Sequence, residues 1–148
     1  KFVGGKRETE LTSLIDLPPT LMSMADIDIP SQYMGIDLTK QITKEEPPRK
    51  NVFMQISEAS NSRAIRTDRY KYAVRDAAPC GYAHAKSDIY FEDYLYDLEK
   101  DPIEKHNLIK DKKYQAIRKE LKEQLIEQML KVGEKKPIIL PAYKVRKK

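Results

Sequence analysis

The sequence predicts an α+β fold in which a small antiparallel sheet of about four strands packs against a long C-terminal helix. Two observations lead to this prediction. Residues 51–98 hold short segments that alternate apolar and polar side chains or are rich in aromatic residues, separated by turn-forming residues. Residues 111–133 instead carry apolar side chains at helical spacing among mostly charged ones. A helix-containing segment is expected before the sheet.

That first helix is expected within residues 11–25, after a short lead-in. Asp16 suits its N-cap, because a carboxylate can accept hydrogen bonds from free backbone amides. Pro18 and Pro19 then fall in the first turn, where a missing donor costs little. The helix is expected to end at Asp26. Its apolar residues share one face: Leu17, Leu21 and Met24.

A loop is expected from residue 31 to residue 50, because it ends in a proline pair flanked by charges, which cannot pair inside a sheet. The chain is therefore divided into residues 1–48, a trailing segment with a linker, and residues 49–148, an α+β subdomain with a basic tail.

Strands are expected at residues 51–57, at 63–66 and 70–75 as a hairpin with its turn at 67–69, and at 89–98. Residues expected to share a face are Val52, Met54 and Ile56 in the first strand, and Tyr70, Tyr72 and Val74 in the hairpin.

The C-terminal helix is expected to begin at an Asp111 N-cap and to close at Gly133, a typical position for a left-handed residue. Residues 137–148 are expected to form an extended tail, with packing through Ile138 to Leu140 as one possibility. The apolar face of the helix comprises Tyr114, Ile117, Leu121, Leu125 and Met129.

Charge and composition exclude several classes of protein. The chain has 148 residues and a formal net charge of +5, but four of these charges lie in the tail after residue 143, so nucleic-acid binding is not expected. Apolar runs are too short for a membrane span. No signal peptide precedes the first residues, which read as the middle of a longer protein, so the compartment stays open.

The sequence holds few candidates for chemistry. Cys80 and His84 lie close enough to meet in one loop, but a thiol–imidazole pair also needs an orienting group. Adding His106 does not complete a zinc site, and the acidic residues at 97–104 lack the spacing of a calcium loop. We therefore predict no catalytic residue and no metal site. One hairpin is basic and could receive an anion, although a solvated face is the simpler reading: Arg63, Arg66, Arg69, Lys71 and Arg75.

Four segments in order resemble the C-terminal end of a sulfatase. They are residues 13–21 (S-L-x-D-L-x-P-T-L), 34–38 (the following G-x-S/D-L loop), 63–72 (R-x-I-R-T-x-x-Y/W-K-Y) and 95–108 (L-Y-D-L-x-x-D-P-x-E-x-x-N-L). One departure is Asp26, where the family usually has glycine. Residues 1–42 then correspond to the edge of an α/β catalytic domain.

The resemblance implies a parent enzyme of the alkaline-phosphatase superfamily that hydrolyses sulfate esters with calcium and a formylglycine from a C-x-P/A-x-R motif. Residues 80–84 do not match that motif, and the family's metal-binding aspartates and asparagine have no counterparts here. The 148-residue chain alone is therefore expected to be inactive. Its expected partners are its own catalytic domain and, in the full enzyme, a sulfated small molecule or sugar.

Two readings of this portion stay open. In the first, the loop at 76–88 faces the rim of the substrate pocket, and Cys80, His84 and Arg66 contact the substrate. In the second, the region is architectural, a clamp on the catalytic domain or a contact between subunits. A parent from a phosphodiesterase or phosphonate-hydrolase branch is a further alternative. The sequence does not name the substrate.

Overall fold

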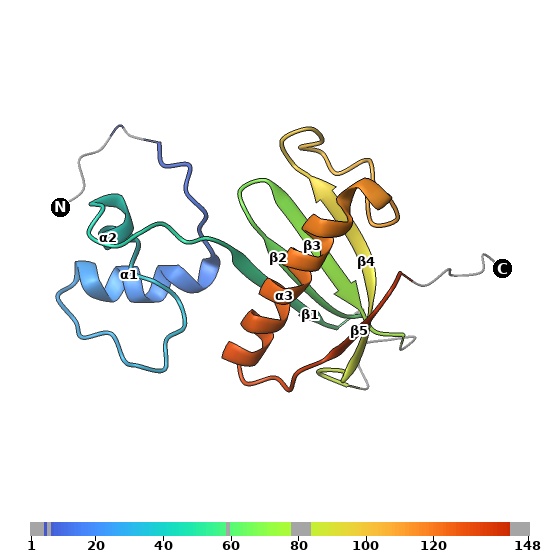
Figure 1. The fold of residues 1–148 in the computed structure, drawn as a ribbon. Coiled ribbons are helices and arrows are strands. Elements are labelled where there is room, and N and C mark those ends of the chain that lie inside the picture. Colours follow the sequence, from blue (N-terminus) through green and yellow to red (C-terminus); the bar gives the residue numbers. More distant parts are fainter. Residues whose placement is uncertain (1–4, 6, 59, 78–83, 143–148) are drawn as a thin grey trace. The chain divides into compact units, whose positions relative to one another are not determined.

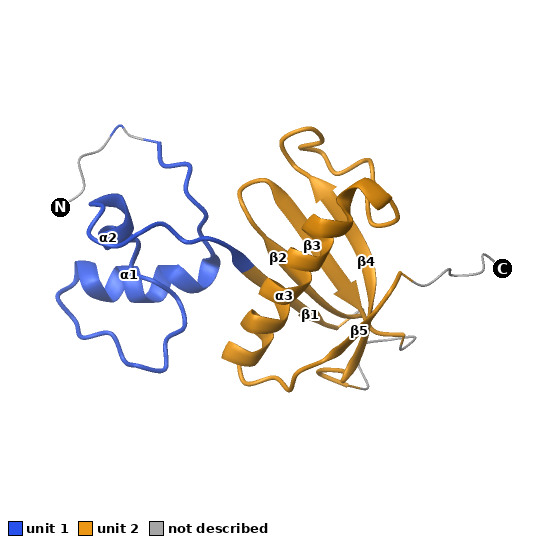
Figure 2. Cartoon of the chain, in the orientation of Figure 1, with its two compact units in different colours: residues 1–52 blue, residues 53–148 orange. Residues whose placement is uncertain are grey.

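Figure 1 shows the fold in a computed structural model, which describes residues 5, 7–58, 60–77 and 84–142. The chain divides into two compact units, residues 1–52 and residues 53–148 (Figure 2). Each unit has its own helices, and the sheet core lies in the second.

The first unit begins with a 3-10 turn, η1 (Leu14–Asp16), that continues into α1 (Leu17–Met24), as the proline-containing sequence predicted. Asp16 occupies the N-cap position, but its predicted capping role is wrong. Its carboxylate makes no cap bond to α1 and instead accepts from the amides of Ser13 (2.7 Å) and Ile36 (2.9 Å). The helix ends as expected, and Asp26 follows in the left-handed region at φ 56°.

The loop after α1 is held against the η1–α1 segment. The Thr20 hydroxyl donates to the Asp16 carbonyl (2.6 Å) and accepts from the Leu38 amide (2.9 Å). Asp37 then caps the short helix α2 (Leu38–Ile42) by accepting from the Thr39 amide at 2.9 Å. The conspicuous polar residues of this unit therefore connect two backbone segments.

The second unit contains a five-stranded sheet with the order β1-β2-β3-β4-β5. The strands are β1 (Val52–Ser57), β2 (Asn61–Arg66), β3 (Tyr70–Arg75), β4 (Ile89–Asp97) and β5 (Ile138–Leu140). Strands β2, β3 and β4 pair antiparallel, whereas β5 is parallel to β4. The expected sheet of four strands thus gains a fifth, three residues long, from the segment that read as a tail.

Helix α3 (Gln115–Lys131) crosses one face of this sheet (Figure 1). Asp111 caps the preceding turn η3 (Lys112–Tyr114) by accepting from the Lys113 amide at 2.9 Å. Gly133 follows the helix at φ 80°. Both predicted ends of this helical segment are confirmed. The core beneath it comprises Ile65, Tyr72, Val74, Tyr90, Leu95, Ile109, Leu121, Leu125, Met129 and Ile139.

The alternation in the strands separates residues that face the core from those that do not. In β3, Tyr72 and Val74 face the core. In β1, Phe53 lies outside the face predicted for Val52, Met54 and Ile56 and packs against the core, while Ile56 is 51% exposed. Among the residues that the structure describes, no helix has the length and apolar character that crossing a membrane requires.

Candidate functional site

The candidate site is the loop between β3 and β4, whose two ends are firmly anchored. At its start, the Asn61 side chain donates to the buried Asp76 carboxylate (2.9 Å), and the Asp76 amide donates back to the Asn61 carbonyl (2.9 Å). At its end, the Ser87 amide donates to the Tyr90 hydroxyl (3.1 Å). Residues 78–83, and with them Cys80, lie outside the described residues.

Arg63 anchors the part of this loop that follows residue 83, through the backbone of Ala85. Its guanidinium is only 2% exposed and donates to the carbonyls of Ala85 (3.0 Å) and Ile56 (3.1 Å). Its Nε donates to Glu134 at 2.7 Å. One buried cation therefore joins β1, β2, the residue after His84 and the segment after α3.

Glu134 reaches Arg63 because of how α3 ends. The Gly133 amide donates to the Leu130 carbonyl (3.0 Å) and the Glu134 amide to the Met129 carbonyl (2.9 Å), the two bonds of a Schellman motif. Only a residue that tolerates positive φ closes this motif easily, and Gly133 does so. The helix end thus positions the carboxylate that neutralises Arg63.

The interpretation of the basic hairpin as a solvated face is wrong for Arg63, which is buried. The alternation of side chains along the strand could have indicated its burial. Alternation within β2 places Arg63 on the same face as Ile65, which lies in the core, and their partners on β3 are the core residues Val74 and Tyr72.

His84 is exposed and directly precedes the anchored Ala85. Arg66 is also exposed, but it ends β2 beside the hairpin turn and pairs with Lys71. The loop lies at the other end of β2, about 17 Å along the strand from Arg66. The structure therefore does not bring Arg66 and His84 together, and each would contact a ligand separately.

Other cations of the hairpin are already paired. Arg69 holds Asp97 through two bonds (3.1 and 2.9 Å), and the Lys71 ammonium lies 2.8 Å from Glu104. Arg66, in contrast, has no ion pair within the part of the chain that the structure describes. Arg66 is therefore the guanidinium of this hairpin that an approaching anion could bind without displacing a carboxylate of the described residues.

The segment from Leu95 to Leu108 uses its polar groups to hold a turn. The Asn107 side chain accepts from the amides of Leu95 (3.1 Å) and Ile109 (3.0 Å) and donates to the Asp93 carbonyl (3.0 Å). Asp101 accepts from the His106 amide at 2.7 Å.

The carboxylates of Asp97, Asp101 and Glu104 do not fit a calcium site, because they already accept from an arginine, a backbone amide and a lysine, respectively. Across the described ranges, no group of three or more His, Cys, Asp or Glu side chains could hold a metal ion.

Asp97 gives this turn a predictable acid sensitivity. The hydrogen bonds from Arg69 lower the pKa of its carboxyl, which is 1% exposed, and they outweigh the opposing effect of burial. A lowered folded-state pKa stabilises the protein above the unfolded pKa of about 3.9, and this stabilisation disappears as the pH falls through the folded value.

We expect Asp97→Asn to unfold at a lower temperature than the wild type at pH 7. The two melting temperatures should converge as the pH falls from about 4 through the lowered pKa of the folded carboxyl, because the wild-type side chain then takes up its proton. Thermal unfolding followed by circular dichroism from pH 2 to pH 7 measures this. A difference between the two proteins that does not change with pH would contradict the assignment.

Comparison with known proteins decides the family. A family model described as "N-sulphoglucosamine sulphohydrolase, C-terminal" matches residues 1–131. The chain belongs to the sulfatase family. Delta 4,5-hexuronate-2-O-sulfatase from Bacteroides thetaiotaomicron is 32% identical over 111 residues, covering 70% of this chain and 20% of that protein. Human arylsulfatase A is 32% identical over 114 residues, covering 68% and 22%.

Solved sulfatase structures share the fold. A 2-O GAG sulfatase aligns with a TM-score of 0.62 and 29% identity over 78% of this chain and 24% of that one. A protein solved in complex with its substrate, D-glucosamine-2-N,6-O-disulfate, has a TM-score of 0.61 and 25% identity over 78% of this chain and 23% of that one. A phosphonate monoester hydrolase of Agrobacterium radiobacter has a TM-score of 0.60 and 25% identity over 81% and 25%.

The chain spans about a fifth to a quarter of the length of these sulfatases and of the hydrolase. The α+β architecture predicted from the sequence is that of a sulfatase C-terminal domain. The four segments that carry the resemblance all lie within the region matched by the family model.

Proposed function

We propose that this chain is the C-terminal portion of an enzyme that hydrolyses sulfate esters. Calcium and the formylglycine nucleophile belong to the catalytic part of that parent. The present residues supply no substitute for either, so the chain by itself should show no sulfatase activity. The role of this chain in the parent enzyme is to pack against the catalytic domain and to present a loop to the substrate.

The apolar surface of the first unit is the observation that carries the packing proposal. Large apolar side chains are concentrated there, although such patches are normally covered in a folded protein. Leu17, Leu21 and Met24, the predicted apolar face of α1, are 49%, 63% and 55% exposed. The exposed set also includes Leu14, Ile15, Ile27 and Met34. In a full-length sulfatase, the catalytic domain, which makes up most of the rest of the protein, would cover this apolar surface.

A second copy of the chain is the other candidate to cover this surface. Size-exclusion chromatography of the full-length parent separates the two. If the catalytic domain covers α1, replacing Leu21 by glutamate should destabilise the parent without changing its oligomeric state. If a second copy covers it, the same change should convert a dimer into a monomer.

The loop proposal rests on the way the chain builds the segment after residue 83. The buried Arg63 and the hydroxyl of Ser57, which donates to Ala85 at 2.7 Å, fix its backbone, while His84 stays exposed. An exposed side chain on a rigid base is suited to contact a ligand. We assign His84, together with Cys80 in the same loop, to the rim of the substrate pocket, and Arg66 to a separate contact with an anionic group.

Replacing His84 by alanine in the full-length enzyme should raise KM severalfold for the sulfated substrate and leave the melting temperature unchanged. The side chain is exposed, so its removal costs little stability. Steady-state kinetics on an aryl sulfate and on sulfated sugars measure the effect.

His106→Ala is the matched control, because that imidazole is 79% exposed in a different turn. Identical kinetic constants for the wild type and His84→Ala across all substrates would refute the rim assignment. That result would favour a purely structural role, as a clamp on the catalytic domain or a contact between subunits.

The likeness to a phosphonate monoester hydrolase supports a second candidate for the parent's reaction. Parallel assays with sulfate monoesters and phosphonate monoesters distinguish the two. A parent that turns over only the phosphonate would overturn the sulfatase proposal while leaving the fold and the packing proposal intact.

A further inference from the structure

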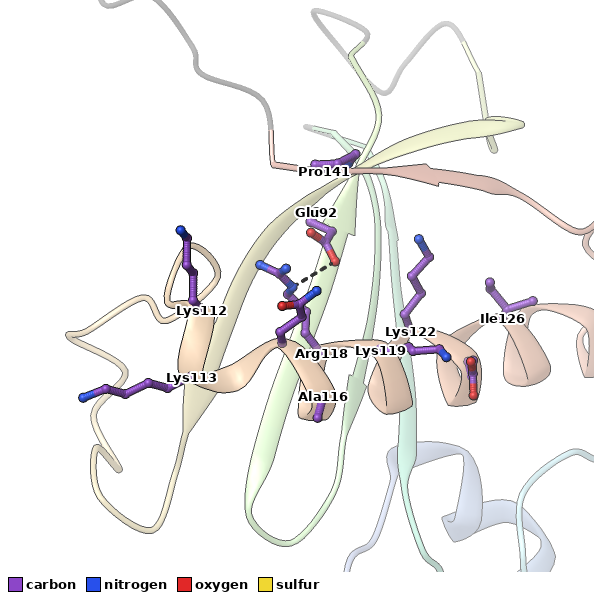
Figure 3. Close-up of a pocket in the computed structure, with 11 residues that line it drawn as sticks. Glu92, Lys112, Lys113, Ala116, Arg118, Lys119, Lys122, Ile126 and Pro141 are labelled. Carbon is purple, nitrogen blue, oxygen red and sulfur yellow. Dashed lines mark ion pairs between the residues drawn. The ribbon is translucent and has the colours of Figure 1, made fainter.

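A groove of about 780 Å³ runs along α3 on the side of β5, within the second unit. Figure 3 shows it with the helix on one side and Pro141, which follows β5, on the other. Its lining comes from η3, α3, β4 and the residue after β5: Glu92, Lys112, Lys113, Gln115, Ala116, Arg118, Lys119, Lys122, Glu123, Ile126 and Pro141.

Five cations and two carboxylates line this groove. Glu92, one of the carboxylates, is 9% exposed and already accepts from the Tyr72 hydroxyl (3.2 Å). Arg118 faces it at 3.5 Å, as the dashed line in Figure 3 marks. Since this pair is internally neutral, the groove keeps four lysines against one further carboxylate, that of Glu123, and the potential that an approaching ligand meets is positive.

The lysines are available to a ligand. Lys112 and Lys119 are exposed, and within the described ranges their ammonium groups have neither an ion pair nor a hydrogen bond. Lys122 donates to the Ile139 carbonyl at 2.8 Å, which fixes its stem and leaves two of its three N–H donors free. In Figure 3, Lys112 and Lys122 extend on either side of the Glu92–Arg118 pair, whereas Lys113 extends away from it.

Three of these lysines form a row. Lys122 lies three residues after Lys119 on α3, so the two side chains are neighbours on the helix surface, and Lys112 lines the same groove from the preceding 3-10 turn η3. At rises of about 1.5 Å per residue in α3 and about 2.0 Å in the turn, the row is about 16 Å long. A single small anion would occupy only part of it, whereas a chain carrying several negative groups would meet all three ammonium groups.

We propose that this groove binds a sulfated oligosaccharide chain. Lysine ammonium groups are mobile point charges, and they suit sulfates at irregular spacing better than a fixed guanidinium fork would. Ala116, Ile126 and Pro141 add apolar contacts for the sugar rings. The choice of a sulfated glycan as the polyanion rests on the proposed function.

Nucleic acid fits the groove less well. No aromatic side chain is among the lining residues, whereas proteins that bind single strands stack the bases on aromatic rings. A sulfated glycan needs no such platform, because its charges and its ring faces are what the groove can contact.

Binding of a fluorescent, fully sulfated glycosaminoglycan octasaccharide to the 148-residue chain tests the proposal by anisotropy. The double variant Lys112→Glu/Lys119→Glu should bind about tenfold more weakly or worse, because each reversal replaces an attraction by a repulsion. Lys105→Glu/Lys110→Glu is the matched control: it has the same net charge, and both lysines are exposed outside the groove. Circular dichroism verifies that both variants fold.

Three results would overturn the proposal. They are equal losses in the two double variants, no loss in either, and equal affinity for the octasaccharide and for single-stranded DNA of matched charge. A strong preference for the sulfated octasaccharide over its desulfated counterpart, lost only in the groove variant, supports it. Because this assay needs no catalysis, its failure leaves the sulfatase proposal standing, and an inactive parent leaves the measured binding standing.

Discussion

Replacing Arg63 by methionine should lower the free energy of unfolding by about 3–5 kcal/mol, the range for removing one partner of a buried ion pair. The change leaves the Glu134 carboxylate, whose side chain is 11% exposed, without its cation. It also removes the donor of three backbone carbonyls, those of Ile56, Ser62 and Ala85. Urea denaturation of the 148-residue chain measures the loss.

Arg66→Met is the matched control, since it removes the same group from an exposed position on the same strand. It should change stability by less than about 0.5 kcal/mol, as surface substitutions usually do. The double variant Arg63→Met/Glu134→Met should be more stable than Arg63→Met alone, because no uncompensated charge remains. Equal stability of Arg63→Met and Arg66→Met would contradict the role given to Arg63.

The parts of the fold that were predicted correctly depend on local sequence. The β2–β3 hairpin follows from alternation around a three-residue turn, in which the Thr67 amide donates to the Tyr70 carbonyl at 2.8 Å. The α3 segment follows from apolar spacing between Asp111 and Gly133, and both residues act as expected. Such features need no information from distant residues.

The parts that were missed depend on contacts between distant residues. Ile138–Leu140 becomes a strand only because β4 offers it an edge, and three residues carry no alternation that could show this in advance. Asp16 was expected to cap its own helix, but Ile36 and Arg49 compete successfully for its carboxylate. Glu134 lies 71 positions after Arg63 in the sequence, so the burial of Arg63 could be inferred only from the register of its neighbours.

The residues that carry the resemblance to sulfatases act here as connectors. Asp16 and Thr20 hold the loop at residues 36–38, and Arg63 holds the loop before β4. Asn107 joins its own turn to β4. A segment can therefore identify a family through the contacts that build its scaffold, while the chemistry lies elsewhere in the parent enzyme.

Gly35 is the tightest of these connections, and substituting it should disrupt the first unit. A Cβ atom added at this residue would lie 1.9 Å from the carbonyl oxygen of Ile15 and 2.5 Å from its carbonyl carbon. Both are backbone atoms, so no side-chain rotation relieves the clash. We expect Gly35→Ala to destabilise this unit by about 2–3 kcal/mol, the upper part of the range for overpacking.

Hydrogen exchange measures the effect where it arises. The amides of Ile36 and Leu38 donate to Asp16 and Thr20, and both should exchange about 30-fold to 150-fold faster if opening becomes easier by that free energy. Gly133→Ala is the control, because a Cβ there meets no atom within 4 Å and strains only the left-handed turn after α3. It should speed exchange near the end of α3 and leave Ile36 and Leu38 unchanged. If Gly35→Ala leaves these two amides as slow as in the wild type, the loop is not held by close backbone packing.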